Sequence, residues 1–123
     1  MIPYVDANFR TLADPLHRGM AGLSMGAGQT SQIAPPHPEV FAYIGLLSGG
    51  TISESQLPDK SKVKLVFMSY GSRENGASGA KTAADALNAA GIKAVGYISD
   101  STAHEFQTWR RSLREMAPLL FQD

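Results

Sequence analysis

The sequence predicts an α/β fold in which about four parallel strands form one sheet with flanking helices. Four short apolar segments alternate along the chain with segments of helical or loop character. Strands that are apolar at nearly every position are typical of a parallel sheet covered on both faces. With 123 residues and an apolar content of 43%, the chain is long enough for a packed core, so we expect residues 1–123 to form a single domain.

The four predicted strands each contain a run of apolar, β-branched or aromatic residues. Residues 63–70 give the strongest signal, because Val-Lys-Leu-Val-Phe-Met-Ser-Tyr is almost continuously apolar and is followed by Gly71. The other three strands are predicted at residues 17–23, 40–47 and 92–98. Their alternation with helices indicates parallel pairing.

Segments of helical and loop character lie between these strands. Residues 78–90 are rich in alanine and end at Gly91, a common residue after a helix. Residues 26–33 form a shorter candidate helix that Pro35 stops. Residues 51–62 are polar and contain proline, and we expect them to form an exposed loop.

A final predicted helix has the clearest period in the chain. Apolar residues recur there at spacings of three and four and would share one buried face: Phe106, Trp109, Leu113, Met116 and Leu120. The charged residues between them would point toward water: Arg110, Arg111, Arg114 and Glu115. Pro118 is expected to end or bend the last turn.

Composition excludes several classes of function. Eleven basic residues balance eleven acidic ones, and nucleic-acid binders usually carry a basic excess. The absence of cysteine excludes disulfides, thiolate metal sites and cysteine nucleophiles. No apolar run approaches the ~20 residues of a membrane helix, and the first residues do not resemble a signal peptide, so the localisation stays open. We expect no nucleic-acid or membrane partner, no metal and no cofactor.

Residues 22–26, Gly-Leu-Ser-Met-Gly, match the G-x-S-x-G nucleophile elbow. Small residues flank such a serine because the chain reverses sharply from strand to helix. Ser24 is therefore the candidate nucleophile, and the backbone N–H of Met25 would face the developing oxyanion. The alternative is an ordinary glycine-rich turn in a chain that has 12 glycines.

A serine nucleophile needs a histidine base, and three histidines are available. In hydrolases with this elbow the chain order is serine, acid, histidine, which favours His104. His104 follows the fourth predicted strand, at the sheet edge where ligand sites form. His17 precedes the serine and His37 lies between two prolines, so we interpret both as surface residues. His104 could also be an ordinary residue at the start of a helix.

The base in turn needs an acid to orient it. Glu74 follows the strongest strand and is expected at the same sheet edge as the serine and the histidine. The alternative is a solvated carboxylate in a turn. Other carboxylates lie on the histidine's own loop, in the polar loop before the third strand, or directly beside the histidine: Asp100, Glu54, Asp59 and Glu105.

Three segments resemble the esterase D-like α/β-hydrolases, in particular feruloyl esterases and related carbohydrate esterases. They are residues 23–30 (Leu-Ser-Met-Gly-Ala-Gly-Gln-Thr), 41–45 (Phe-Ala-Tyr-Ile-Gly) and 103–113 (Ala-His-Glu-Phe-Gln-Thr-Trp-Arg-Arg-Ser-Leu), and residues 3–11 resemble the stretch before the elbow. The resemblance implies that Ser24 is the nucleophile, Glu74 the acid and His104 the base. Ala27 departs from the family, which usually has glycine there.

A larger departure is length, since the family's earlier strands precede the elbow and have no counterpart here. The chain thus resembles the C-terminal half of the domain, a truncated α/β-hydrolase without the loop that donates the second oxyanion N–H. The resemblance implies a serine carboxylesterase for short-chain, aryl, acetyl or feruloyl esters, including esters linked to carbohydrate. Without that donor we expect weak activity. The alternative is an inactive fragment that acts as a non-enzymatic interaction module.

Truncation would also leave the elbow strand at the edge of the sheet, with unpaired backbone groups. Residues 8–13 predict barely two helical turns, which is a small cover for such an edge. We therefore expect a homodimer that covers the exposed sides.

Overall fold

The computed structural model describes residues 1–122 and has a four-stranded parallel sheet at its centre. The strands lie in the order β1-β2-β3-β4, so each pairs with its neighbours in the sequence. Each begins two or three residues later than predicted: β1 (Gly19–Leu23), β2 (Tyr43–Leu47), β3 (Leu65–Gly71) and β4 (Ala94–Ser99). The predicted α/β class and the parallel pairing of the four strands are confirmed.

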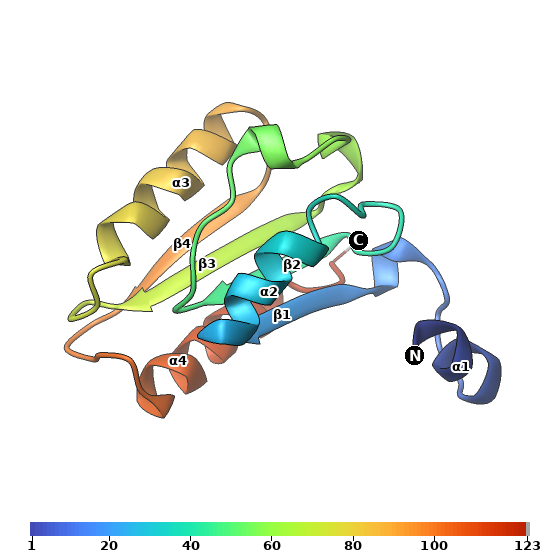
Figure 1. The fold of residues 1–123 in the computed structure, drawn as a ribbon, viewed down its shortest axis with the longest axis horizontal. Helices are drawn as coiled ribbons and strands as arrows, with labels where there is room; N and C mark the ends of the chain where they lie inside the picture. Colours follow the sequence, from blue (N-terminus) through green and yellow to red (C-terminus); the bar gives the residue numbers. More distant parts are fainter. Residues whose placement is uncertain (123) are drawn as a thin grey trace.

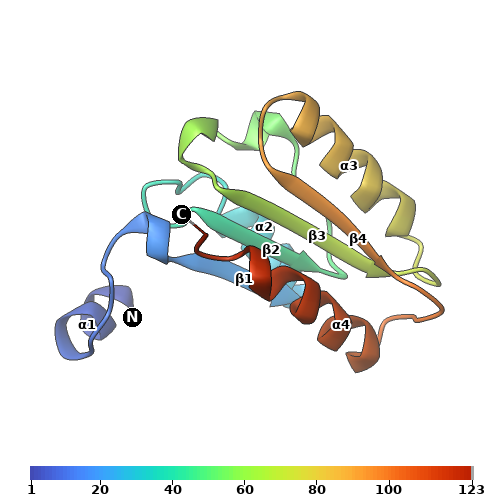
Figure 2. The same ribbon diagram turned by 180° about the vertical axis from the view of Figure 1, so that it is seen from behind.

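Helices cover both faces of this sheet (Figures 1 and 2). Helices α2 (Met25–Ile33) and α3 (Ala77–Ala89) lie on one face, and α4 (Phe106–Met116) lies on the other. Strands added in one direction by right-handed crossovers place every connecting segment on the same face. The helix after the last strand is then free to pack on the opposite face, as α4 does.

The central strand β3 contributes to the cores on both faces of the sheet. Val66 and Met68 are buried in the cluster under α2 and α3, whereas Leu65 and Phe67 are buried in the cluster that includes Met116 of α4. Successive side chains of a strand point to opposite faces, so a strand covered on both sides must be apolar at almost every position. This arrangement explains the continuous apolar run that made β3 the strongest prediction.

The segment 51–62 is largely exposed, as predicted, but it is not purely a loop and two of its side chains are buried. It contains two short 3₁₀ helices, η2 (Glu54–Gln56) and η3 (Lys60–Lys62), and Ile52 and Leu57 are buried in the same core cluster as α2 and α3. The isolated apolar residues of this segment therefore anchor it to the sheet.

The predicted buried face of the last helix is confirmed at Met116 and is wrong at Phe106 and Leu113, while Trp109 and Leu120 are partly buried against the same core as Met116. The side chains that α4 buries are Thr108, Ser112 and Met116, whereas Phe106 is 70% exposed and Leu113 is 54% exposed. The Thr108 hydroxyl donates to Oγ1 of Thr102, 2.7 Å away in the loop after β4, so a polar contact is buried on this helix where only apolar residues were expected. The helix ends at Met116, and Pro118 falls near the start of the 3₁₀ helix η4 (Ala117–Leu119), where its missing N–H is tolerated.

The exposed apolar residues of α4 border a shallow apolar groove beside β1. The groove has a volume of about 280 Å³, and its lining includes Leu23, Phe106, Trp109 and Leu113. β1 is an edge strand in the described part of the chain, because it pairs there with β2 alone. An apolar groove therefore lies next to an open sheet edge.

The N-terminal helix lies earlier in the chain than predicted and apart from the sheet. Helix α1 spans Ile2–Asn8, whereas residues 9–13 are not helical. Figures 1 and 2 show α1 beyond the beginning of β1, so it does not cover the length of that strand's edge. An ion pair of 2.9 Å between Asp6 of α1 and Arg18 fastens it there.

Candidate active site

Ser24 occupies the sharp turn between β1 and α2. It is the N-cap of α2 and has a φ of 54°, in a region of backbone conformation that favours glycine. Its N–H donates to the carbonyl oxygen of Leu47 at 2.8 Å, which ties the turn to β2. A strained serine between strand and helix is the geometry that the G-x-S-x-G pattern predicts.

Two glycines make room for this turn, and only one of them belongs to the flanking pair of the motif. A Cβ on Gly22 would overlap the carbonyl of Gly26, and a Cβ on Gly49 would overlap the carbonyl of Ser24. A Cβ on Gly26 would meet no atom within 4 Å. A side chain larger than glycine would therefore collide at Gly22 but not at Gly26. Gly49 is also required to be glycine, and the G-x-S-x-G motif does not show this.

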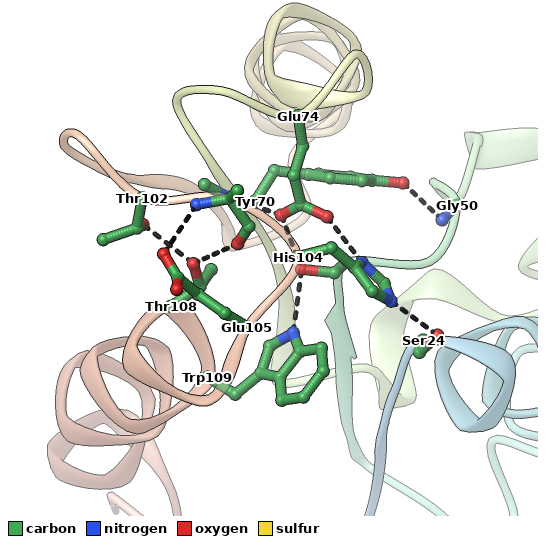
Figure 3. A network of polar contacts seen from close by, with 12 residues as sticks. Ser24, Gly50, Tyr70, Glu74, Thr102, His104, Glu105, Thr108 and Trp109 are labelled. Carbon is green, nitrogen blue, oxygen red and sulfur yellow. Dashed lines mark hydrogen bonds and ion pairs between the residues drawn. The ribbon is translucent and has the colours of Figure 1, made fainter.

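The structure brings Ser24, His104 and Glu74 together at the carboxyl edge of the sheet (Figure 3). The Ser24 Oγ atom lies 2.8 Å from Nε2 of His104, and Nδ1 of His104 lies 2.7 Å from Oε1 of Glu74. An ionised carboxylate only accepts hydrogen bonds, so Nδ1 donates its proton to Glu74. In the neutral imidazole, Nε2 then has a free lone pair that accepts the Ser24 hydroxyl proton.

Glu74 is held by donors on both of its carboxylate oxygens. Its side chain is only 10% exposed, and its Oε2 accepts the Gly71 N–H at 2.7 Å and the Ser48 hydroxyl at 2.8 Å. Burial acts to raise the pKa of Glu74, but the hydrogen bonds from Gly71, His104 and Ser48 outweigh it and hold that pKa below its ordinary value. The carboxylate is thus kept ionised beside the imidazole.

Ser48 and Trp109 join this network, although no motif in the sequence gives either of them a functional role. The Trp109 indole Nε1–H donates to the Ser48 Oγ at 3.0 Å. The Trp109 ring meets the His104 ring edge to face, with centroids 5.1 Å apart (Figure 3). Two signals were available: Ser48 directly follows a strand at the same sheet edge, and Trp109 lies five residues after His104.

The Met25 N–H lies at the amino end of α2. The first N–H groups of a helix have no acceptor within the helix and carry the positive end of its dipole. Met25 is the first residue of α2 and directly follows Ser24, so its amide is available beside the serine hydroxyl.

The other histidines lie in pairs of their own. His17 contacts Asp14 at 2.8 Å and His37 contacts Glu39 at 2.9 Å, in agreement with their interpretation as surface residues. The alternative acids likewise have other surroundings. Glu54 pairs with Lys60, Asp59 caps η3 and pairs with Lys62, Glu105 accepts the Ala103 N–H, and Asp100 is exposed.

Residues 1–122 contain neither a metal-ligating cluster nor a helix that could span a membrane. No cluster of three or more histidine, aspartate or glutamate side chains there has the geometry to hold a metal ion. No helix in that part of the chain has the length and apolar character needed to span a membrane.

A parallel α/β sheet with a serine at a strand-to-helix turn, next to a histidine and a carboxylate, defines the class of the α/β-hydrolases. The family comparison agrees: an Esterase family model, described as "Putative esterase", matches residues 1–120. This chain belongs to that esterase family.

One sequence relative and two solved structures are similar to this chain. The chain is 49% identical over 122 residues to an endo-1,4-beta-xylanase/feruloyl esterase of Xylanibacter ruminicola, and the match covers 99% of this chain and 17% of that protein. Its fold is similar to that of a ferulic acid esterase (TM-score 0.76, 20% identity, 95% of this chain and 56% of that one). It is also similar to an S-formylglutathione hydrolase from Staphylococcus aureus (TM-score 0.67, 17% identity, 95% and 56%). The chain thus spans a small part of the curated relative and just over half of each solved structure.

Proposed function

We propose that this chain is a serine carboxylesterase in which Ser24 is the nucleophile, His104 the base and Glu74 the acid. The observation that carries this proposal is the unbroken series of hydrogen bonds from the Ser24 hydroxyl through both ring nitrogens of His104 to Glu74. Membership of the esterase family supports the same reaction class. No cofactor takes part in the proposed mechanism.

The proposed reaction has two halves that share the same groups. His104 Nε2 takes the Ser24 proton while Oγ attacks the ester carbonyl, and the negative oxygen of the tetrahedral intermediate lies at the Met25 N–H. The imidazolium then gives its proton to the departing alcohol, which leaves an acyl-serine. Water attacks this acyl-enzyme with His104 again as base, and release of the carboxylic acid restores Ser24. Glu74 stays ionised throughout and stabilises the imidazolium.

The proposed substrates are short-chain, aryl, acetyl or feruloyl esters, the last two including esters carried by plant carbohydrate. Support comes from the relative named as a xylanase and feruloyl esterase, which is 49% identical over nearly the whole of this chain. Because the chain covers 17% of that protein, the substrate range is tested directly on the 123-residue chain. We propose weak turnover, since Met25 is the one oxyanion donor assigned to the site and the loss of one such donor typically costs ~10²–10³ in kcat.

Hydrolysis of p-nitrophenyl acetate and methyl ferulate tests the proposal. We expect measurable turnover by the wild type and none above background by Ser24→Ala, with the melting temperature unchanged. The matched controls are two histidine variants. His104→Ala should lose activity, whereas His37→Ala, which removes a histidine paired with Glu39, should keep it. Wild-type activity in Ser24→Ala would overturn the proposal.

Covalent labelling separates an esterase from a non-enzymatic interaction module. An organophosphorus reagent that resembles an activated ester should modify Ser24 in the wild type and should not modify the chain in His104→Ala. A folded wild-type chain that neither hydrolyses esters nor reacts with the reagent would support the interaction module instead.

We also propose that residues 1–123 act as one domain and that a second copy covers the β1 edge. One shared sheet with a core on each face supports the single domain. Leu23, Phe106 and Leu113 are each more than a third exposed and line one groove next to β1, which supports an interface there. A symmetric dimer would cover this edge and groove on both copies at once.

A further inference from the structure

We infer that Ser48 and Trp109 are positioning residues for the site: the Trp109 indole N–H holds the Ser48 hydroxyl so that its proton points at Glu74 Oε2, which leaves Oε1 for His104. This inference rests on the proposed function for its effect on turnover. Both residues act through Glu74, and Trp109 also contacts the His104 ring.

The direction of each hydrogen bond follows from the chemistry of the two ends. An indole N–H can only donate, and an ionised carboxylate can only accept. The Ser48 Oγ lies 3.0 Å from Trp109 Nε1 and 2.8 Å from Glu74 Oε2. Its hydroxyl must therefore accept from Trp109, and its own proton goes to Glu74. Trp109 thus fixes the orientation of a hydroxyl that would otherwise rotate.

The backbone at Ser48 gives an independent indication of a functional role. Ser48 directly follows β2, is only 6% exposed, and has a φ of 55°, a conformation that costs free energy for any residue other than glycine. A buried serine thus occupies a strained backbone position, although a glycine could take the same conformation without strain, as the neighbouring residues Gly49 and Gly50 are both glycines. Such outliers concentrate at functional sites.

The carboxylate geometry shows what this positioning achieves. Oε2 of Glu74 receives two donors, the Gly71 N–H and the Ser48 hydroxyl, and Oε1 receives the His104 Nδ1–H. With Oε2 fully engaged, rotation of the carboxylate away from His104 would break two hydrogen bonds. The edge-to-face contact of Trp109 with the imidazole constrains the ring from its other side.

Two substitutions test the hydrogen bonds that join Trp109, Ser48 and Glu74. Ser48→Ala removes the hydroxyl, and Trp109→Phe keeps an aromatic ring against His104 but removes the N–H. The matched control is Ser69→Ala, because Ser69 is a fully buried serine on the neighbouring strand β3 whose Oγ has no hydrogen-bond partner within residues 1–122. All three variants are checked for an unchanged melting profile.

The first measurement does not depend on activity. The protonation of Glu74 is followed by carboxyl ¹³C NMR, with the Glu74 signal assigned by its loss in Glu74→Gln. We expect the pKa of Glu74 to rise toward its ordinary value in Ser48→Ala, to rise less in Trp109→Phe, and to stay at the wild-type value in Ser69→Ala. An unchanged titration in Ser48→Ala, or an equal rise in Ser69→Ala, would overturn the inference.

The second measurement is ester turnover. Removal of a hydrogen bond to a charged group should lower kcat about tenfold in Ser48→Ala, with little change in KM. If Trp109 acts through Ser48, then Trp109→Phe lowers kcat in the wild type but has little further effect in the Ser48→Ala background. Full additivity of the two losses would contradict this.

The two proposals fail in different ways. If the pKa of Glu74 shifts as expected but the chain has no esterase activity, then the inference about Ser48 and Trp109 stands and the proposed esterase function fails. If Ser48→Ala keeps normal turnover while Ser24→Ala loses activity, then the esterase function stands and the positioning role of Ser48 and Trp109 fails.

Discussion

Gly22 lies so close to Gly26 that a Cβ on Gly22 would overlap the Gly26 carbonyl oxygen and carbon. The reverse does not hold, because a Cβ on Gly26 would meet no atom within 4 Å. The elbow therefore depends on its first glycine for space and not on its last. This asymmetry makes the two glycines a matched pair for mutagenesis.

Gly22→Ala should destabilise the fold by about 1–3 kcal/mol, because the new methyl group meets rigid backbone rather than a flexible side chain. It should also lower esterase activity, since the displaced turn carries Ser24. Gly26→Ala should leave stability unchanged or raise it by up to about 1 kcal/mol, since alanine favours the helix. Urea unfolding of both variants measures the difference, and equal losses of stability would contradict the steric argument.

Loss of the acid should cost less turnover than loss of the nucleophile. Glu74→Gln keeps the shape of the side chain and removes the charge that stabilises the imidazolium, whereas Ser24→Ala removes the bond-forming atom. In a serine hydrolase the corresponding acid variant retains roughly tenfold to hundredfold more activity than the nucleophile variant. Single-substrate kinetics on p-nitrophenyl acetate compare the two, and a Glu74→Gln variant as fast as the wild type would place the acid elsewhere.

Glu74 should also make stability depend on pH in a defined direction. Its pKa in the folded chain is lowered from the ordinary value of 4.5, so at mildly acidic pH the unfolded state binds more protons than the folded state. The stabilisation is therefore present above about pH 4.5 and is lost as the pH falls through the lowered pKa. Urea midpoints between pH 3 and 7 should decline at the acid end more steeply for the wild type than for Glu74→Gln. Parallel curves would show that Glu74 does not contribute.

The open β1 edge leads to a prediction about assembly. Light scattering at micromolar concentration should give about twice the 13.1 kDa of one chain. Leu113→Glu, which places a charge in the groove beside β1, should shift the particle toward a monomer, whereas Ala86→Glu on the exposed side of α3 should not. A stable wild-type particle near 13 kDa would contradict the dimer.

The sequence was most informative where one residue type serves one purpose. The apolar run of β3 marked a strand covered on both faces, and Gly22-Leu-Ser placed Ser24 at a turn because few residues other than glycine leave the room that it needs. The chain order of serine, glutamate and histidine then indicated which side chains would meet, and the structure brings Ser24, Glu74 and His104 to hydrogen-bond distance.

The sequence was least informative where a helix face has more than one way to pack. The period of Phe106, Trp109 and Leu113 is correct for a helix, but hydrophobicity does not show that Thr108 and Ser112 are buried, with their hydroxyls bonded to the loop after β4 and to the helix's own backbone. Ser48 was missed for a related reason: its position after a strand was a signal, but the sequence does not show its partner Trp109, which lies 61 residues further along the chain.

The strand order has a consequence for how the molecule fluctuates. Ser24 follows β1 and His104 follows β4, the two outer strands of the described sheet, whereas Ser48 and Glu74 follow the inner strands β2 and β3. Outer strands open locally at lower free energy than inner ones, and hydrogen exchange detects such opening. Fraying of β1 would carry the serine away from a histidine and glutamate that remain in place. Where no second copy covers the β1 edge, mild heat or low urea should therefore inactivate the chain reversibly before the sheet as a whole unfolds.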